Sequence, residues 1–83
     1  MITVDVTDEL TKTIPTGEVL EATNVLFFQN TGSYDIRMST KAFSADNEGE
    51  VICPKAGRQL TDAKTLYFKS TTNTPVHLRA VEL

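Results

Sequence analysis

Short runs in which apolar and polar residues alternate follow one another along the chain, and this pattern restricts the possible fold more than any other feature. Ile2, Val4 and Val6 alternate with polar residues, and the same period of two returns over 34–39, 65–70 and 76–81. Successive side chains of a strand point to opposite faces, whereas no segment has the 3.6-residue period of a helix. The sequence therefore predicts about six to eight short strands and no significant helix.

Turn residues separate these runs. Glycine, proline, asparagine and serine stand at 15–17, at 30–33 and at 71–75, and a further polar turn is predicted at 61–64. The polar stretch 40–49 predicts a long exposed loop. Strands spaced in this way predict an all-β fold, namely a small antiparallel β-sandwich or barrel.

The chain has 83 residues, which leaves room for one domain. We predict an N-terminal strand or arm over residues 1–17 and a single β domain over residues 18–83. Residues 1–14 are extended, rich in threonine and weakly apolar, so they are either an edge strand or an arm that reaches a neighbouring chain.

The most apolar run, residues 25–29, is predicted to be the central strand. The alternation in each strand assigns one set of side chains to the interior. The predicted core consists of Val4, Val6, Ile14, Leu20, Val25, Phe27, Ile36, Met38, Ile52, Leu60, Leu66, Phe68, Val76 and Leu78.

Several large apolar residues remain on the opposite faces of their strands, and these predict an interface. They are Leu26, Phe28, Tyr67, Val81 and Leu83. A chain of this size buries only about 60% of its surface on folding, so one apolar face is expected to meet another chain in a homo-oligomer. The alternative is that a second sheet of the same chain covers this face and returns Phe28 to the monomer core.

Residues that carry catalysis or bind metals are sparse. The single histidine, His77, and the single cysteine, Cys53, lack neighbours of the kind that activate a nucleophile or complete a zinc site, and we predict a buried, inert thiol. Carboxylates alternate over 46–50 as at the start of a calcium loop, but position 12 would be Gly57 in place of the bidentate glutamate. We therefore expect no enzyme activity, no metal and no cofactor.

Charge and hydropathy restrict the partners. Eight basic and eleven acidic residues give a net charge of −3, which disfavours nucleic acid. No apolar run approaches the ~20 residues of a membrane span, and the first residues lack the features of a signal peptide. We expect neither nucleic acid nor membrane as a partner, and synthesis in the cytoplasm.

The segments FQNTGSYDIR at 28–37 and KTLYFKS at 64–70, followed by a terminal strand that ends at 81–83, resemble the hairpins of small all-β virion proteins of tailed bacteriophages. Within that group the chain is most similar to capsid decoration (cement) proteins. The resemblance implies a trimer or dimer bound to the major capsid protein or other virion subunits, on a virion made in the host cytoplasm. The alternatives are a receptor- or carbohydrate-binding module of a tail or fibre, and a small enzyme or enzyme inhibitor.

Overall fold

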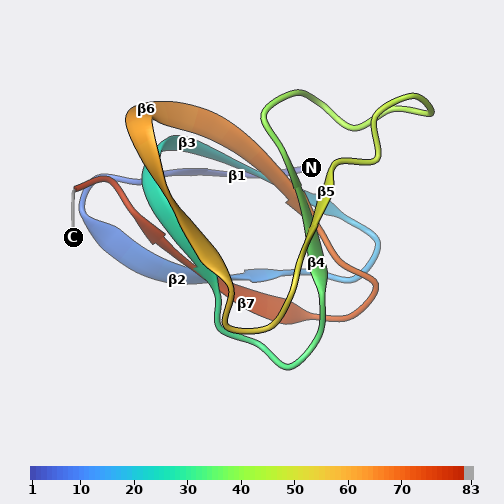
Figure 1. Cartoon of the computed structure of the whole chain (residues 1–83). Coiled ribbons are helices and arrows are strands. Elements are labelled where there is room, and N and C mark those ends of the chain that lie inside the picture. Colours follow the sequence, from blue (N-terminus) through green and yellow to red (C-terminus); the bar gives the residue numbers. More distant parts are fainter. Residues whose placement is uncertain (82–83) are drawn as a thin grey trace.

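The structure is a computed structural model, and it describes residues 1–81 (Figure 1). These residues form seven strands and no helix, which confirms the predicted all-β class. The strands are β1 (Ile2–Asp5), β2 (Glu9–Ile14), β3 (Val19–Asn30), β4 (Ile36–Ser39), β5 (Glu50–Ile52), β6 (Gly57–Lys69) and β7 (Thr74–Arg79).

The strands join into one sheet in the order β2-β7-β3-β6-β4-β5, and β1 pairs with β3 in parallel. All other pairs are antiparallel. The first half of β3 pairs with the end of β6 and with β1, whereas the second half pairs with the start of β6 and with β7. Figure 1 shows the two long strands, β3 and β6, curving around the interior, as expected for a small sandwich or barrel.

Two irregularities in β3 decide which of its side chains point inward. The register with β6 shifts between Ala22 and Val25, where Asn24 has a φ of 62°, and again between Val25 and Phe27. The first shift reverses the buried face, so that Val25 is buried where Leu20 and Ala22 were before it, and the second shift restores the original face. Phe28 is therefore fully buried and Phe27 only half-buried, so the predicted assignment of these two residues is wrong.

The core otherwise follows the predicted alternation. Phe28 and Phe68 pack edge to face, with ring centroids 5.6 Å apart and an interplanar angle of 69°. Val4 and Leu60 are partly buried against this cluster. The buried apolar residues are Val6, Ile14, Leu20, Ala22, Val25, Phe28, Ile36, Met38, Ile52, Leu66, Phe68, Val76 and Leu78.

The N-terminal segment lies in the sheet. β1 pairs with β3, and β2 pairs with β7 along its whole length. Val6 and Ile14 are buried in the core, and the Val6 amide donates a hydrogen bond to the Thr23 carbonyl at 3.1 Å. Residues 1–14 therefore form strands of the chain's own sheet, and the alternative of an arm that reaches a neighbouring chain is corrected.

Two predicted connections have different outcomes. The turn predicted at 61–64 is absent, because β6 continues as a strand through these exposed residues, although its pairing with β3 skips 60–63. The exposed loop predicted at 40–49 is confirmed, and Figure 1 shows it projecting beyond β4 and β5.

Asn30, which the sequence assigned only to a turn, is a buried polar residue that joins three segments. Its side-chain Nδ2 donates to the carbonyls of Tyr34 at 2.8 Å and Ile52 at 3.1 Å, and its Oδ1 accepts from the Gly32 amide at 3.0 Å. Its own amide donates to the Ala56 carbonyl at 2.9 Å. Asn30 therefore fixes the loop that leads into β4 against the end of β5.

Candidate functional site

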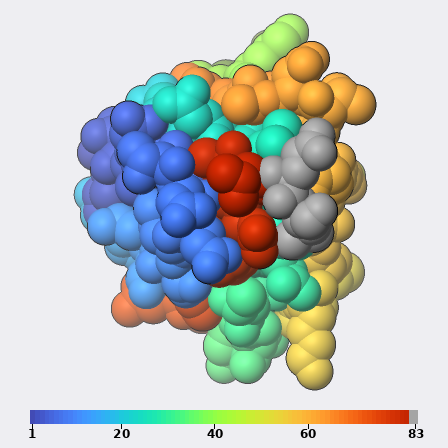
Figure 2. Space-filling model, turned by 90° about the vertical axis from the view of Figure 1, so that its left-hand side faces the viewer, coloured from blue at the N-terminus to red at the C-terminus, as the bar shows by residue number. Residues whose placement is uncertain are grey.

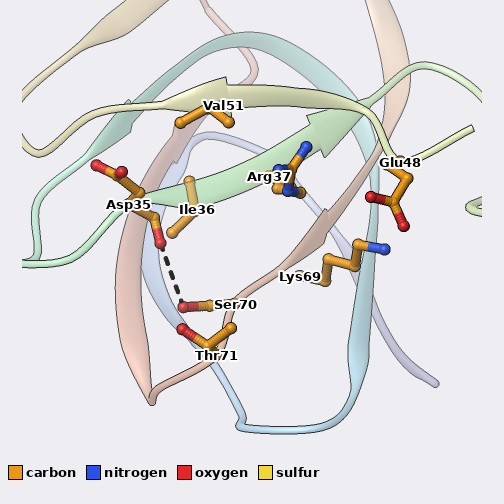
Figure 3. A pocket seen from close by; sticks show the side chains of 8 residues that line it. All are labelled: Asp35, Ile36, Arg37, Glu48, Val51, Lys69, Ser70 and Thr71. Atoms are coloured by element: carbon orange, nitrogen blue, oxygen red, sulfur yellow. Dashed lines mark hydrogen bonds between the residues drawn. The ribbon is translucent and has the colours of Figure 1, made fainter.

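A pocket of about 440 Å³ opens on the outer surface where β4 lies between β5 and the end of β6 (Figure 3). Residues from these strands, from the turn after β6 and from the 40–49 loop line it. They are Asp35, Ile36, Arg37, Glu48, Val51, Lys69, Ser70 and Thr71. We call this pocket, together with the exposed Tyr34 that precedes Asp35 in the chain, the Arg37 face.

Strand register brings the central residues of this face together. Arg37 lies opposite Val51 on β5 and opposite Lys69 on β6, so the three side chains stand in one row across the sheet. Ile36 is buried, and Figure 3 shows Asp35 and Arg37 flanking it along the chain. Residues two apart in a strand share a face, so Asp35 and Arg37 both belong to the outer surface.

The returning end of the 40–49 loop lies against the end of β4 and completes the rim of the pocket. Asn47 Nδ2 donates to Ser39 Oγ at 2.9 Å, and Asn47 Oδ1 accepts from the Gly49 amide at 3.2 Å. Gly49 has a φ of 75°, and a Cβ there would lie 2.6 Å from the Met38 carbonyl oxygen, so the close approach requires glycine. This geometry places Glu48 at the pocket.

Charges of both signs line the pocket without pairing. Arg37 and Lys69 balance Asp35 and Glu48, and none of the four takes part in an ion pair within residues 1–81. Lys69 Nζ lies 4.4 Å from the centroid of the Phe43 ring, a cation–π contact that positions this ammonium group. The Arg37 guanidinium and the Asp35 carboxylate have no such contact in the described chain.

A neighbouring pair of opposite charges behaves differently. Arg58 on β6 binds Glu50 on β5 with two parallel hydrogen bonds, one of them 2.7 Å between Nη1 and Oε1. The hydrogen bond from Arg58 lowers the pKa of the Glu50 carboxyl, and the hydrogen bond to Glu50 raises the pKa of Arg58. This pair links the two strands on either side of the 53–56 turn.

A second outer surface, which we call the β2–β7 face, has polar groups that bind one another. Glu9 Oε2 lies 3.3 Å from Arg79 Nη1 and 3.4 Å from His77 Nε2, and Thr11 Oγ1 lies 3.2 Å from His77 Nδ1. Figure 2 shows β2 in blue beside β7 in red on this side of the molecule. These contacts join the edge strand β2 to its neighbour β7. Among the described residues, Arg79 Nε is the only buried side-chain nitrogen or oxygen atom without a hydrogen-bond partner.

The structure separates the residues that the sequence assigned to one interface. Phe28 belongs to the core, because the second register shift returns the buried face to the one shared with Leu20 and Ala22, so it is not available to another chain. Leu26 is half-buried, and Val81 is 41% exposed. Leu83 lies outside the described residues.

Tyr67 lies away from Val81. It is half-buried and stands opposite Glu21, whose carboxylate raises the pKa of the Tyr67 hydroxyl. β7 meets β3 only from Phe27 onward, so Tyr67 and the end of β7 flank different halves of β3. The single patch expected if these strands were aligned is not formed. Cys53 is exposed, which also corrects the predicted buried thiol.

No protein-family model, curated protein or solved structure matches the chain. Residues 1–81 contain neither a helix long and apolar enough to cross a membrane nor a group of three or more side chains placed to hold a metal ion. The function therefore has to be argued from the surface chemistry of the chain itself.

Proposed function

We propose that the protein is a non-enzymatic structural component of a phage virion, namely a head decoration protein that binds the capsid lattice in multiple copies. The observation that carries this proposal is the Arg37 face, where opposite charges stand together without ion pairs beside Val51 and Tyr34, which are 45% and 58% exposed. Such a surface suits contact with another protein chain. Repetition on a lattice turns modest contacts of this kind into firm attachment.

The two edge strands of the sheet, β2 and β5, are poorly suited to pair with a strand of another chain, which favours contact through side chains. β2 pairs only with β7, and β5 pairs only with β4, so each has an open edge. Lys12 lies on the inner side of β2 opposite Val76, and an inward charge on an edge strand opposes pairing with another strand. β5 has only three residues, which limits what it can add to a neighbouring sheet.

Co-expression with the major capsid protein of the same genome tests the proposal. Assembled shells would be separated on a density gradient, and we expect the chain to sediment with them in many copies per shell. R37D should release it, whereas K64D, which makes the same change of charge at an exposed site on β6, should not. Wild-type protein that stays at the top of the gradient would contradict the proposal.

The pocket also favours a second candidate, a receptor- or carbohydrate-binding module of a tail or fibre. Its volume of about 440 Å³ falls within the range of about 300–1,000 Å³ that is usual for ligand sites. Ser70 and Thr71 offer hydroxyl groups beside the charged side chains. A glycan array distinguishes the candidates, because the decoration protein should bind no glycan on it.

A further inference from the structure

We propose that the Arg37 face joins two copies of this chain about a two-fold axis that passes near Ile36. The inference deepens the proposed function, on which it rests for the expectation that several copies act together. A second copy on the Arg37 face excludes a capsid subunit from it, so this face acts in lattice binding by coupling two copies, whose other surfaces meet the lattice. It assigns the contact to residues on β4, away from the interface that the sequence predicted.

Two opposite charges stand two residues apart on this face. Asp35 and Arg37 flank the buried Ile36 on the outer surface (Figure 3). A two-fold axis near Ile36 exchanges their positions, so Asp35 of each copy faces Arg37 of the other. The contact is isologous, because one patch meets the same patch on the second copy, and it forms two identical ion pairs.

The side chains are free although the backbone that carries them is fixed. Asn30 binds the Tyr34 carbonyl at 2.8 Å, and Ser70 Oγ donates to the Asp35 carbonyl at 3.5 Å. Neither the Asp35 carboxylate nor the Arg37 guanidinium has a hydrogen bond or ion pair within residues 1–81. A fixed backbone loses little conformational entropy when a partner binds, so the cost of ordering is confined to the side chains.

Charge also favours this surface over others as a contact between copies. The chain has a net charge of −3, so two copies repel each other in most orientations. At the pocket the charges of Arg37 and Lys69 cancel those of Asp35 and Glu48, and this repulsion is locally absent. Val51 and Tyr34 supply apolar surface that a second copy would bury.

Sedimentation equilibrium of the full chain at several concentrations tests the proposal. We expect a monomer–dimer equilibrium in the wild type, and D35R and R37D should each weaken dimerisation at least tenfold, because each places like charges opposite one another at two symmetric positions. The double variant D35R/R37D should restore dimerisation, since the exchanged charges are again complementary. K64D and D46R, which make the same changes of charge at exposed sites elsewhere, should leave dimerisation unchanged.

A mixture of the two single variants provides a second test that does not need the double variant to fold. One variant then carries two arginines and the other two aspartates, so we expect a heterodimer where each variant alone is monomeric. Circular dichroism checks that each variant is folded. A strictly monomeric wild type, single variants that dimerise normally, or a folded mixture that does not associate would each overturn the proposal.

Capsid binding is measured separately, which keeps the two proposals apart. A dimer that fails to bind shells removes the virion role and leaves the two-fold contact intact. A chain that decorates shells but stays monomeric at every concentration removes the two-fold contact alone.

Discussion

The β2–β7 face and the Arg37 face are both outer surfaces of one sheet, yet only the first is complete within the chain. Glu9 reaches Arg79 and His77 on the neighbouring strand, so the Glu9 carboxylate meets the Arg79 guanidinium and the His77 ring. On the Arg37 face, two basic and two acidic side chains line the pocket, but no ion pair forms among them within residues 1–81. The comparison indicates that the β2–β7 face stabilises the fold, whereas the Arg37 face is available to a partner.

The largest expected effect comes from removing residues 1–14, which deletes β1, β2 and half of the β2–β7 face. We expect the shortened chain to be unfolded, because Val6 and Ile14 leave the core and β7 loses one of its two neighbours. Circular dichroism measures the loss, and R37D, which alters only the Arg37 face, is the folded control. A shortened chain with the β-sheet spectrum and a cooperative melt would show that the N-terminal strands are dispensable.

Phe28→Ala tests the inward turn of β3 that separates the core from the outer surface. Because Phe28 is fully buried against Phe68, the truncation should lower the free energy of unfolding by about 3–5 kcal/mol. The matched variant Phe27→Ala should cost about 1 kcal/mol, because its ring is only half-buried. Urea denaturation gives both values, and equal losses would contradict the observed register.

Asn30→Ala should lower the free energy of unfolding by about 2 kcal/mol or more, because it leaves buried partners of the Asn30 amide without hydrogen bonds. The same change should disturb the Arg37 face, since Asn30 holds the loop that leads into β4. Urea denaturation combined with amide chemical shifts measures both effects. Asn73→Ala is the comparison: Asn73 Oδ1 also accepts hydrogen bonds, from the Thr16 amide and hydroxyl, but in an exposed turn, so its loss should cost less, and an equal loss would show that burial gives Asn30 no special role.

The smallest expected effect concerns the paired charges beside the Arg37 face. The folded-state pKa of Glu50 is lowered, so its stabilising effect is present above the unfolded value of 4.5 and is lost as the pH falls through the folded pKa. Both side chains are about half exposed, so Glu50→Gln should cost at most about 1 kcal/mol at pH 7 and nothing in strong acid. Thermal melts from pH 7 to pH 2 measure this, and Arg37→Gln should leave monomer stability unchanged throughout.

The alternation of residues was sufficient to predict the fold class, the exposed 40–49 loop and the inward residues of β2, β4 and β7. It could not predict β3 correctly, because the left-handed conformation of Asn24 and the second shift before Phe27 follow from pairing with β6. A strict period of two therefore interchanged Phe27 and Phe28.

The candidate site was only half visible in the sequence. The alternation placed Asp35 and Arg37 on an outer face, but nothing in the sequence indicates that Lys69 and Val51 stand on either side of Arg37. Strand order depends on contacts between residues far apart in the chain, and these contacts form only in the folded protein.

Amide chemical shifts recorded over a range of protein concentrations test the central claim most directly, because they compare the two faces in one sample. We predict that the shifts of residues 34–37 and of Val51 change with concentration, whereas those of Glu9, Thr11 and His77 stay constant. Concentration-dependent shifts confined to the β2–β7 face, or none at all at concentrations up to the solubility limit, would contradict the assignment of the Arg37 face as the association surface.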